Sequence, residues 1–229
     1  MPLRNGRDYL YLIWKDSNTR RQFIVGELSK NGQFEFRYVE EVEQAIECGF
    51  KPLVCFPNVS KVYVSDRLFS VFSSRLPDKK RKDMNKILEK YRLKEYDEYV
   101  LLKRSGARLP IDSLSFIDPI FDLDQPFCRS FYVAGVRHYL NCKGQECELL
   151  NIVTRGDEVK LQMEEGNSYD EHAVQILTLS DELIGYVPRF YSSGIAELLK
   201  DNRKIERHIS SVEKDKNCNE CIKVILSVR

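Results

Sequence analysis

The sequence has no long hydrophobic run. Its longest, Tyr9 to Trp14, has six residues and is followed at once by charged side chains. A helix needs about 20 apolar residues to cross a bilayer, and an export signal also needs a longer apolar stretch. We therefore expect a cytoplasmic protein without membrane contact, in which the seven cysteines stay reduced.

An excess of charge of one sign is also missing. The 36 basic residues are nearly balanced by 35 acidic ones, which leaves a net charge of +1. This balance does not indicate a protein that holds duplex DNA by a basic surface alone. Residues 1–126 carry a net +3 and residues 127–229 a net −2. If the second part binds nucleic acid, it must do so through a local pocket.

Patterns typical of enzymes are scarce. The chain has three histidines, no Gly-x-Ser-x-Gly elbow and no Gly-x-x-x-x-Gly-Lys-Ser/Thr phosphate loop. A metal nuclease is the enzymatic alternative left open, built from Asp157, Glu164, Glu165 and Asp170. Neighbouring residues on a strand point to opposite faces, which weakens that alternative for the two glutamates. We expect a protein that is not an enzyme and that needs no cofactor.

Four cysteines leave a zinc site open. Cys218 and Cys221 form a Cys-x-x-Cys pair, and Cys142 with Cys147 is a looser pair that would complete four thiolates. No histidine pattern supports the site. We favour plain loop or core cysteines.

Length and composition indicate two folded α+β domains. The chain has 229 residues, of which 42% are hydrophobic and 11% aromatic. Residues 108–127 are rich in proline and aspartate and are typical of a linker. We place the domain boundary near Gln125, with domains at 1–125 and 126–229.

The first domain is expected to mix strands and helices. Apolar segments at 9–14, 22–28 and 34–38 predict strands, with Asn31-Gly32 as a hairpin turn. Helices are predicted at 40–49, 77–93 and 96–105. The helix at 77–93 is amphipathic, with a polar side that holds Lys79, Lys80, Arg81, Lys82, Lys86 and Lys90. We favour a solvated surface there, and a contact with phosphates or an acidic partner is the alternative.

The second domain is predicted to be a small twisted sheet that can close into a barrel. Short strands are expected at 131–136, 158–163, 172–179, 183–187 and 221–229, with a helix at 192–200. Three motifs stand at the expected strand ends: AGVRHY (134–139), NSYDEHAV (167–174) and IGYVPR (184–189). Loops at the ends of rigid strands often form binding sites. A tyrosine beside an amide and a carboxylate indicates a ligand, because a plain hairpin turn needs only small residues.

These motifs, in their order and spacing, resemble the HIRAN domain family. They read FYVAGVRHY, RGDEVKLQMEEGNSYDEHAVQI and IGYVPRFYSSGIAELL. The resemblance implies an OB-like barrel of about six strands. In eukaryotic fork-remodelling translocases this domain captures the 3′ end of single-stranded DNA, so the resemblance implies a role in DNA repair, processing or defence.

The resemblance also implies a role for each motif residue. Arg137 would hold a phosphate, Tyr169 and His138 would stack on bases, and Asp170 would accept the 3′ hydroxyl proton. Asn167 would brace the loop or touch the terminal sugar, and the pocket would be completed by Tyr139, Tyr186 and Arg189.

Each of these residues also has an ordinary structural interpretation. Tyr169 can be a core tyrosine, Asp170 can cap a turn, Arg137 can form a salt bridge, and His138 can be a rim residue.

The first domain has its own weaker resemblances. LFSVFSSRLPDKKRKDMNKIL and DEYVLLKRSGARLPIDSL look like the segment ahead of HIRAN in stand-alone bacterial proteins. Residues 8–110 are more distantly similar to the N-terminal subdomain of HipA-type kinases. That similarity implies a competing function, in which the first domain binds a kinase-like or nuclease partner.

Overall fold

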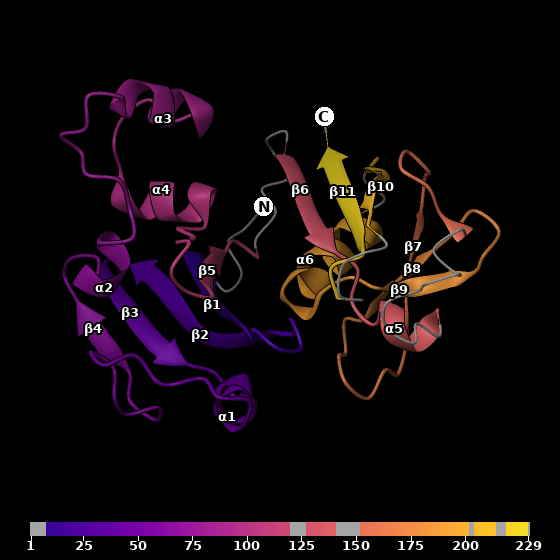
Figure 1. Cartoon of the computed structure of the whole chain (residues 1–229), viewed down its shortest axis with the longest axis horizontal. Helices are drawn as coiled ribbons and strands as arrows, with labels where there is room; N and C mark the ends of the chain where they lie inside the picture. The colour runs from indigo at the N-terminus through magenta and orange to yellow at the C-terminus, as the bar shows by residue number, and fades with distance from the viewer. Residues whose placement is uncertain (1–7, 120–126, 141–151, 202–203, 214–218, 229) are drawn as a thin grey trace. The chain divides into compact units, whose positions relative to one another are not determined.

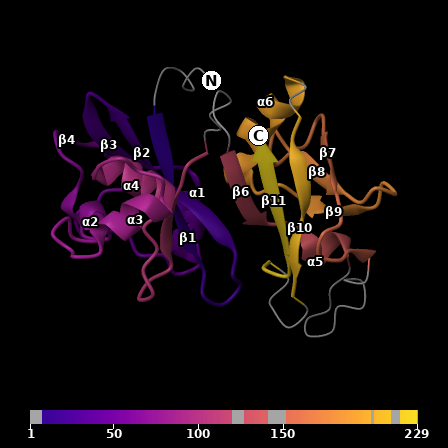
Figure 2. The same ribbon diagram turned by 90° about the horizontal axis from the view of Figure 1, so that it is seen from above.

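The computed structural model describes residues 8–119, 127–140, 152–201, 204–213 and 219–228. The chain divides into two compact units that separate between Pro119 and Ile120, and each is described by itself. The boundary predicted near Gln125 lies outside the described residues. Helices and strands are mixed in both units, which confirms the α+β class (Figure 1, Figure 2).

The N-terminal unit is built on a five-stranded antiparallel sheet with the order β4-β3-β2-β1-β5. Its strands are β1 (Asp8–Lys15), β2 (Gln22–Asn31), β3 (Gln33–Tyr38), β4 (Tyr63–Ser65) and β5 (Leu114–Ile117). The predicted turn is confirmed, because Asn31 pairs with Gln33 across Gly32, whose φ is 80°.

Strand β5 corrects the prediction that residues 108–127 are a linker. Leu114–Ile117 pairs with Tyr11–Trp14 of β1, and Phe116 is buried in the core. The strand has only four residues, and it lies between Pro110 and Pro119. So short a segment shows little of the alternation typical of a strand. The proline and aspartate content of residues 108–127 therefore favoured a linker.

Four helices accompany this sheet: α1 (Glu41–Glu47), α2 (Ser70–Ser73), α3 (Met84–Lys90) and α4 (Glu98–Ser105). The amide of Val100 donates to the Asp97 side chain at the start of α4, and left-handed Gly106 ends it. Helix α3 is shorter than predicted. The Asp78 carboxylate accepts a hydrogen bond from the Lys80 amide at 2.8 Å, and such a local bond favours a turn over a helix.

The core of this unit is aromatic, with Phe36 at its centre. The Phe36 ring centroid lies 4.5 Å from that of Phe56 and 5.2 Å from those of Tyr38 and Phe72. Gly26 allows this packing, because a Cβ there would come within 2.6 Å of the Phe36 ring.

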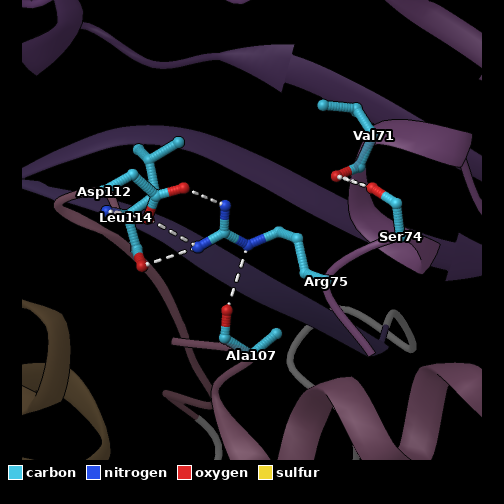
Figure 3. A network of polar contacts seen from close by, with 6 residues as sticks. All are labelled: Val71, Ser74, Arg75, Ala107, Asp112 and Leu114. Carbon is cyan, nitrogen blue, oxygen red and sulfur yellow. Dashed lines mark hydrogen bonds and ion pairs between the residues drawn. The ribbon is translucent and has the colours of Figure 1, made fainter. Parts of the chain in front are cut away.

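Arg75 fastens the supposed linker to α2 (Figure 3). Its guanidinium donates to the carbonyl oxygens of Ala107 (3.0 Å) and Leu114 (2.9 Å) and to both carboxylate oxygens of Asp112 (2.5 and 2.9 Å). Hydrogen bonding to Arg75 lowers the pKa of Asp112. The segment before β5 is therefore a fixed part of the unit.

The C-terminal unit contains two three-stranded antiparallel sheets, ordered β10-β11-β6 and β7-β8-β9. The first consists of β6 (Phe127–Tyr132), β10 (Glu206–Val212) and β11 (Ile222–Val228). The second consists of β7 (Lys160–Met163), β8 (Val174–Leu177) and β9 (Leu183–Tyr186). Two helices, α5 (Val136–Tyr139) and α6 (Arg189–Lys200), complete it.

The predicted closed barrel is not confirmed. In the described part of the chain, the six strands form two separate sheets, joined by isolated bridges at Ala134–Tyr186 and Glu158–His208. Helix α6 packs beside the first sheet, where the rings of Phe131 and Tyr191 are 5.7 Å apart (Figure 1). None of the helices within the described ranges has the length and apolar character that a membrane span requires.

Candidate nucleic-acid interface

Residues Arg137, His138 and Tyr139 lie on the one-turn helix α5 and not at the end of a strand as predicted. The cause is Gly135, which adopts the left-handed conformation at φ 76° and turns the chain away from the direction of β6. All three side chains are exposed. The motif therefore presents a short helix, and its basic residues extend into solvent.

A close backbone contact holds α5 against β9. Ala134 and Tyr186 exchange two hydrogen bonds between their amides and carbonyls, both of 2.8 Å. Gly185 makes this approach possible, because a Cβ there would lie 2.4 Å from the Ala134 oxygen. The ring centroids of Tyr139 and Tyr186 are consequently 5.3 Å apart.

The hydroxyl of Tyr186 belongs to a polar network. Gln175 Nε2 donates to it at 3.4 Å. Burial raises the pKa of Tyr186 to about 12, and hydrogen bonds with the side chains of Tyr139 and Glu164 act in the same direction. Tyr186 therefore connects α5 to the start of the loop between β7 and β8.

Asn167 carries this network into the loop. Its Nδ2 donates to Glu164 Oε2 at 2.6 Å, while its Oδ1 accepts from the amides of Tyr169 (2.9 Å) and Asp170 (3.0 Å). These are the contacts of a residue that braces a loop, which is one of the two roles implied for it.

Tyr169 and Asp170 occupy the outer part of the loop. Tyr169 is 88% exposed, so it is not a core tyrosine. Asp170 is half-buried, and its Oδ1 accepts from the amide of His172 at 2.9 Å. Asp170 thus caps a turn, while its Oδ2 has no hydrogen-bond partner among the described residues. One carboxylate oxygen is available for a ligand.

The cationic residues are also accessible. The side chains of Arg137 and His138 have no hydrogen bond or ion pair within the described ranges, and Arg189 is exposed at the first turn of α6. Tyr139 and Tyr186 are in ring contact, and Asn167 is joined to Glu164 at the end of β7. Arg137, His138, Tyr169, Asp170 and Arg189 are attached to these residues through the backbone of their own segments.

Two members of the network, Glu164 and Gln175, were not predicted as nucleic-acid-binding residues, and Glu164 was named only in the metal-nuclease alternative. Glu164 stands three residues before Asn167, and this spacing is the only signal that the sequence offers. Gln175 has no such signal in the sequence, because its role depends on strand pairing with Tyr186.

The metal-site alternatives involve other residues. In the described residues, no group of three or more His, Cys, Asp or Glu side chains is placed to hold a metal ion. The Asp157 carboxylate accepts hydrogen bonds from the amide (2.7 Å) and hydroxyl (2.9 Å) of Thr154. Of the four candidate zinc thiols, Cys221 is buried. The other three, Cys142, Cys147 and Cys218, lie outside the described residues.

Comparison with known proteins gives a family match for the second part of the chain. The sequence model of the HIRAN domain family matches residues 127–229, which confirms the predicted resemblance for that part of the chain. The comparison with curated proteins gives no match. No comparison supports the likeness of residues 8–110 to HipA-type kinases.

Two solved structures are similar to part of this chain. A protein from Lactobacillus plantarum has 22% identity and a TM-score of 0.36, over 45% of this chain and 96% of that one. The HIRAN domain of human HLTF has 14% identity and a TM-score of 0.34, over 46% of this chain and 80% of that one.

Proposed function

With residues 127–229 matched to the HIRAN family, we propose that the chain binds single-stranded DNA at a 3′ end without cleaving it. Such binding would serve DNA repair, processing or defence. The observation that carries the proposal is the polar network of Gln175, Tyr186, Glu164 and Asn167. It fixes a loop with an exposed tyrosine and a carboxylate in place beside a basic one-turn helix.

The exposed groups match what a strand end presents. Tyr169 offers a ring to an unpaired base, and such stacking contributes about 1 to 3 kcal/mol per base. Arg137 offers a planar guanidinium that can hold a phosphate through two hydrogen bonds. Both groups are exposed in the structure, so a ligand would reach them without a change of conformation.

Asp170 supplies the selectivity for an end. Its Oδ1 accepts a hydrogen bond from the His172 amide, so Oδ2 is the oxygen that accepts a hydrogen bond from a ligand. A terminal nucleotide has a 3′ hydroxyl that donates. An internal nucleotide has an ester at that position and no donor, and a carboxylate there would also repel the phosphate.

The test is a binding titration with three oligonucleotides of the same sequence: one with a free 3′ hydroxyl, one with a 3′ phosphate and one closed into a circle. We expect the first to bind most tightly. Equal affinity for all three would reject end capture even if the chain binds DNA. The length of the oligonucleotide after incubation with Mg²⁺ tests the absence of cleavage.

Two pairs of variants sharpen this test. Tyr169→Ala should lose the tighter binding of the free 3′ hydroxyl oligonucleotide, whereas Tyr169→Phe should keep it because the ring remains. Asp170→Asn keeps the oxygen that caps the turn but exchanges the free acceptor for a donor, so it should abolish the preference for the 3′ hydroxyl. Asp201→Asn, an exposed carboxylate at the end of α6, controls for the loss of one negative charge.

A further inference from the structure

We propose that the segment Pro77–Tyr96 of the N-terminal unit binds the phosphate backbone of single-stranded nucleic acid. This contact needs no strand end, so it does not rest on the proposed 3′-end site. We call the segment the basic segment.

The basic segment concentrates positive charge. It holds eight basic residues and four acidic ones, and its net charge of +4 exceeds the net +3 of residues 1–126. All eight basic side chains are exposed: Lys79, Lys80, Arg81, Lys82, Lys86, Lys90, Arg92 and Lys94. The positive charge of this part of the protein therefore lies on one continuous stretch of chain.

The segment is fixed at both ends and along its apolar side. The Tyr96 hydroxyl donates to the Pro77 carbonyl at 3.1 Å and closes it. Ile87, Tyr91 and Leu93 pack against the hydrophobic core of the unit. Figure 1 shows α4 between α3 and the sheet. Helix α3, which carries Lys86 and Lys90, therefore lies on the outer side of the unit.

Most of these cations have no acidic partner among the residues that the structure describes. In the described part of the chain, Arg81 is the only one with an ion pair, to Asp83 at 2.9 Å. Lys86 and Lys90 stand four residues apart on α3 and so share one face. Lysines held close together without counterions repel one another. A polyanion with regularly spaced charges relieves that repulsion when it binds. Its own counterions are released at the same time, which also favours binding.

Two tyrosines favour a single strand over an acidic peptide. The Lys90 ammonium lies 5.3 Å from the centroid of the Tyr91 ring, and the Lys79 ammonium lies 5.9 Å from that of Tyr96. Both rings are half-buried, so each keeps an accessible edge or face. The cation can hold a phosphate while the neighbouring ring stacks on a base. Grooves that bind single strands combine cations and aromatic rings in this way.

The test uses the full chain and a circular single-stranded oligonucleotide, which has no terminus. Affinity is measured over a range of salt concentrations for the wild type and for the triple variant Lys80→Gln, Lys82→Gln, Lys86→Gln. Each lost phosphate contact lowers the slope of log affinity against log salt by about 0.7, so we expect a slope about 2 smaller. At low salt the affinity should fall on the order of tenfold.

A second triple variant with the same change of charge is the control: Lys51→Gln, Lys61→Gln, Arg67→Gln. These exposed residues lie outside the basic segment, so the slope should stay that of the wild type. An equal loss in both triple variants would overturn the proposal. So would a wild type that binds polyglutamate but not the circle, because the partner would then be an acidic protein.

The two proposed sites fail in distinguishable ways. The Lys80, Lys82, Lys86 variant should keep the ratio of affinities for the 3′ hydroxyl and 3′ phosphate oligonucleotides. Tyr169→Ala should lose that ratio and keep the salt slope on the circle.

Discussion

Glu164 and Asn167 are joined side chain to side chain, with Glu164 Oε2 2.6 Å from Asn167 Nδ2. The bond ties the loop to a strand end, because the Glu164 amide also donates to the Ala173 carbonyl across the loop at 2.9 Å. The Glu164 side chain thus holds Asn167 of the β7–β8 loop at the end of β7, and it also contributes to the raised pKa of Tyr186 on β9. The shape of the loop is set by the polar contacts of Glu164, Asn167 and Asp170 and not by the Tyr169 side chain.

We predict that Glu164→Ala weakens binding to a free 3′ end although Glu164 itself touches no nucleotide. Asn167 loses a hydrogen-bond partner, and a hydrogen bond contributes about 0.5 to 1.5 kcal/mol, so the affinity should fall about twofold to tenfold. Glu164→Gln keeps an acceptor and should restore most of it. A fluorescence anisotropy titration measures the change.

The neighbouring residue provides the control for this prediction. Glu165 is exposed, and no hydrogen bond of its side chain occurs in the described residues. Glu165→Ala removes the same charge one position away and should bind like the wild type. If both alanine variants lost the same affinity, charge and not loop geometry would be the cause.

Gly185→Ala should separate α5 from β9. The added Cβ would meet the Ala134 carbonyl oxygen at 2.4 Å and Val133 Cγ1 at 2.7 Å, so the bridge between Ala134 and Tyr186 cannot persist. Forcing an atom into a packed site costs about 1 to 3 kcal/mol, and the loss should appear in urea unfolding. We also expect loss of 3′-end binding, since Tyr139 and Arg137 shift with α5.

Gly156→Ala tests whether this effect is specific. Gly156 also has a positive φ, of 98°, but a Cβ there would meet no atom within 4 Å. Only the backbone strain of about 1 to 2 kcal/mol should appear, and 3′-end binding should be kept. Lost binding in this variant would mean that overall stability, and not the bridge, controls the site.

The sequence revealed the parts of the site that depend on local patterns. The strands flanking NSYDEHAV alternate in polarity, and the exposed position of Tyr169 follows from its place in a hairpin loop. Helix α5 was missed because four residues after a single left-handed glycine give no helical period. Strand β10 was missed because Ile209 is its only fully buried side chain.

The long-range contacts could not be predicted from the sequence. The bridge between Ala134 and Tyr186 joins segments about fifty residues apart, and it depends on Gly185 lacking a side chain. The barrel was expected from the family resemblance. Among the described residues the two sheets meet only at single bridges, so the strand count was right and the closure was not confirmed.

Arg75→Lys should destabilise the N-terminal unit although the charge is kept. The Arg75 side chain is only 7% exposed and makes hydrogen bonds in three directions, which a single ammonium group cannot reproduce. Arg75→Ala leaves the partly exposed Asp112 carboxylate with only the hydrogen bond from the Leu114 amide. Hydrogen bonds to charged groups contribute about 1.5 to 3 kcal/mol, and the loss should lie in that range. Urea unfolding followed by the fluorescence of Trp14 reports on this unit.

The pH dependence of the unfolding free energy distinguishes the contribution of the Arg75–Asp112 ion pair from that of Arg75 packing. Because Arg75 lowers the pKa of Asp112, the pair stabilises the fold above the unfolded pKa of that carboxyl. This stability is lost as the pH falls through the lower, folded pKa. In Arg75→Ala the unfolding free energy should change less between neutral and acid pH than in the wild type. An unchanged acid dependence would assign the loss of stability to packing alone.

Alkaline pH should destabilise the N-terminal unit through Tyr38. Its hydroxyl donates to the Phe56 carbonyl at 3.0 Å and accepts from the Leu53 amide at 2.8 Å, and burial raises its pKa to about 12. The folded state therefore holds this proton more tightly than the unfolded chain, whose tyrosine titrates near 10. Stability from this group is complete below pH 10 and is lost as the pH rises toward 12.

Tyr38→Phe isolates this contribution. It removes the titrating group and both hydrogen bonds, so the variant should be about 1 to 3 kcal/mol less stable at pH 7. Between pH 10 and 12 its unfolding free energy should fall less steeply than that of the wild type. Tyr63→Phe, a half-exposed tyrosine of the same unit, should keep the steep fall. Equal slopes in the wild type and Tyr38→Phe would show that another group governs alkaline unfolding, and the raised pKa of buried Tyr99 makes it the next residue to replace.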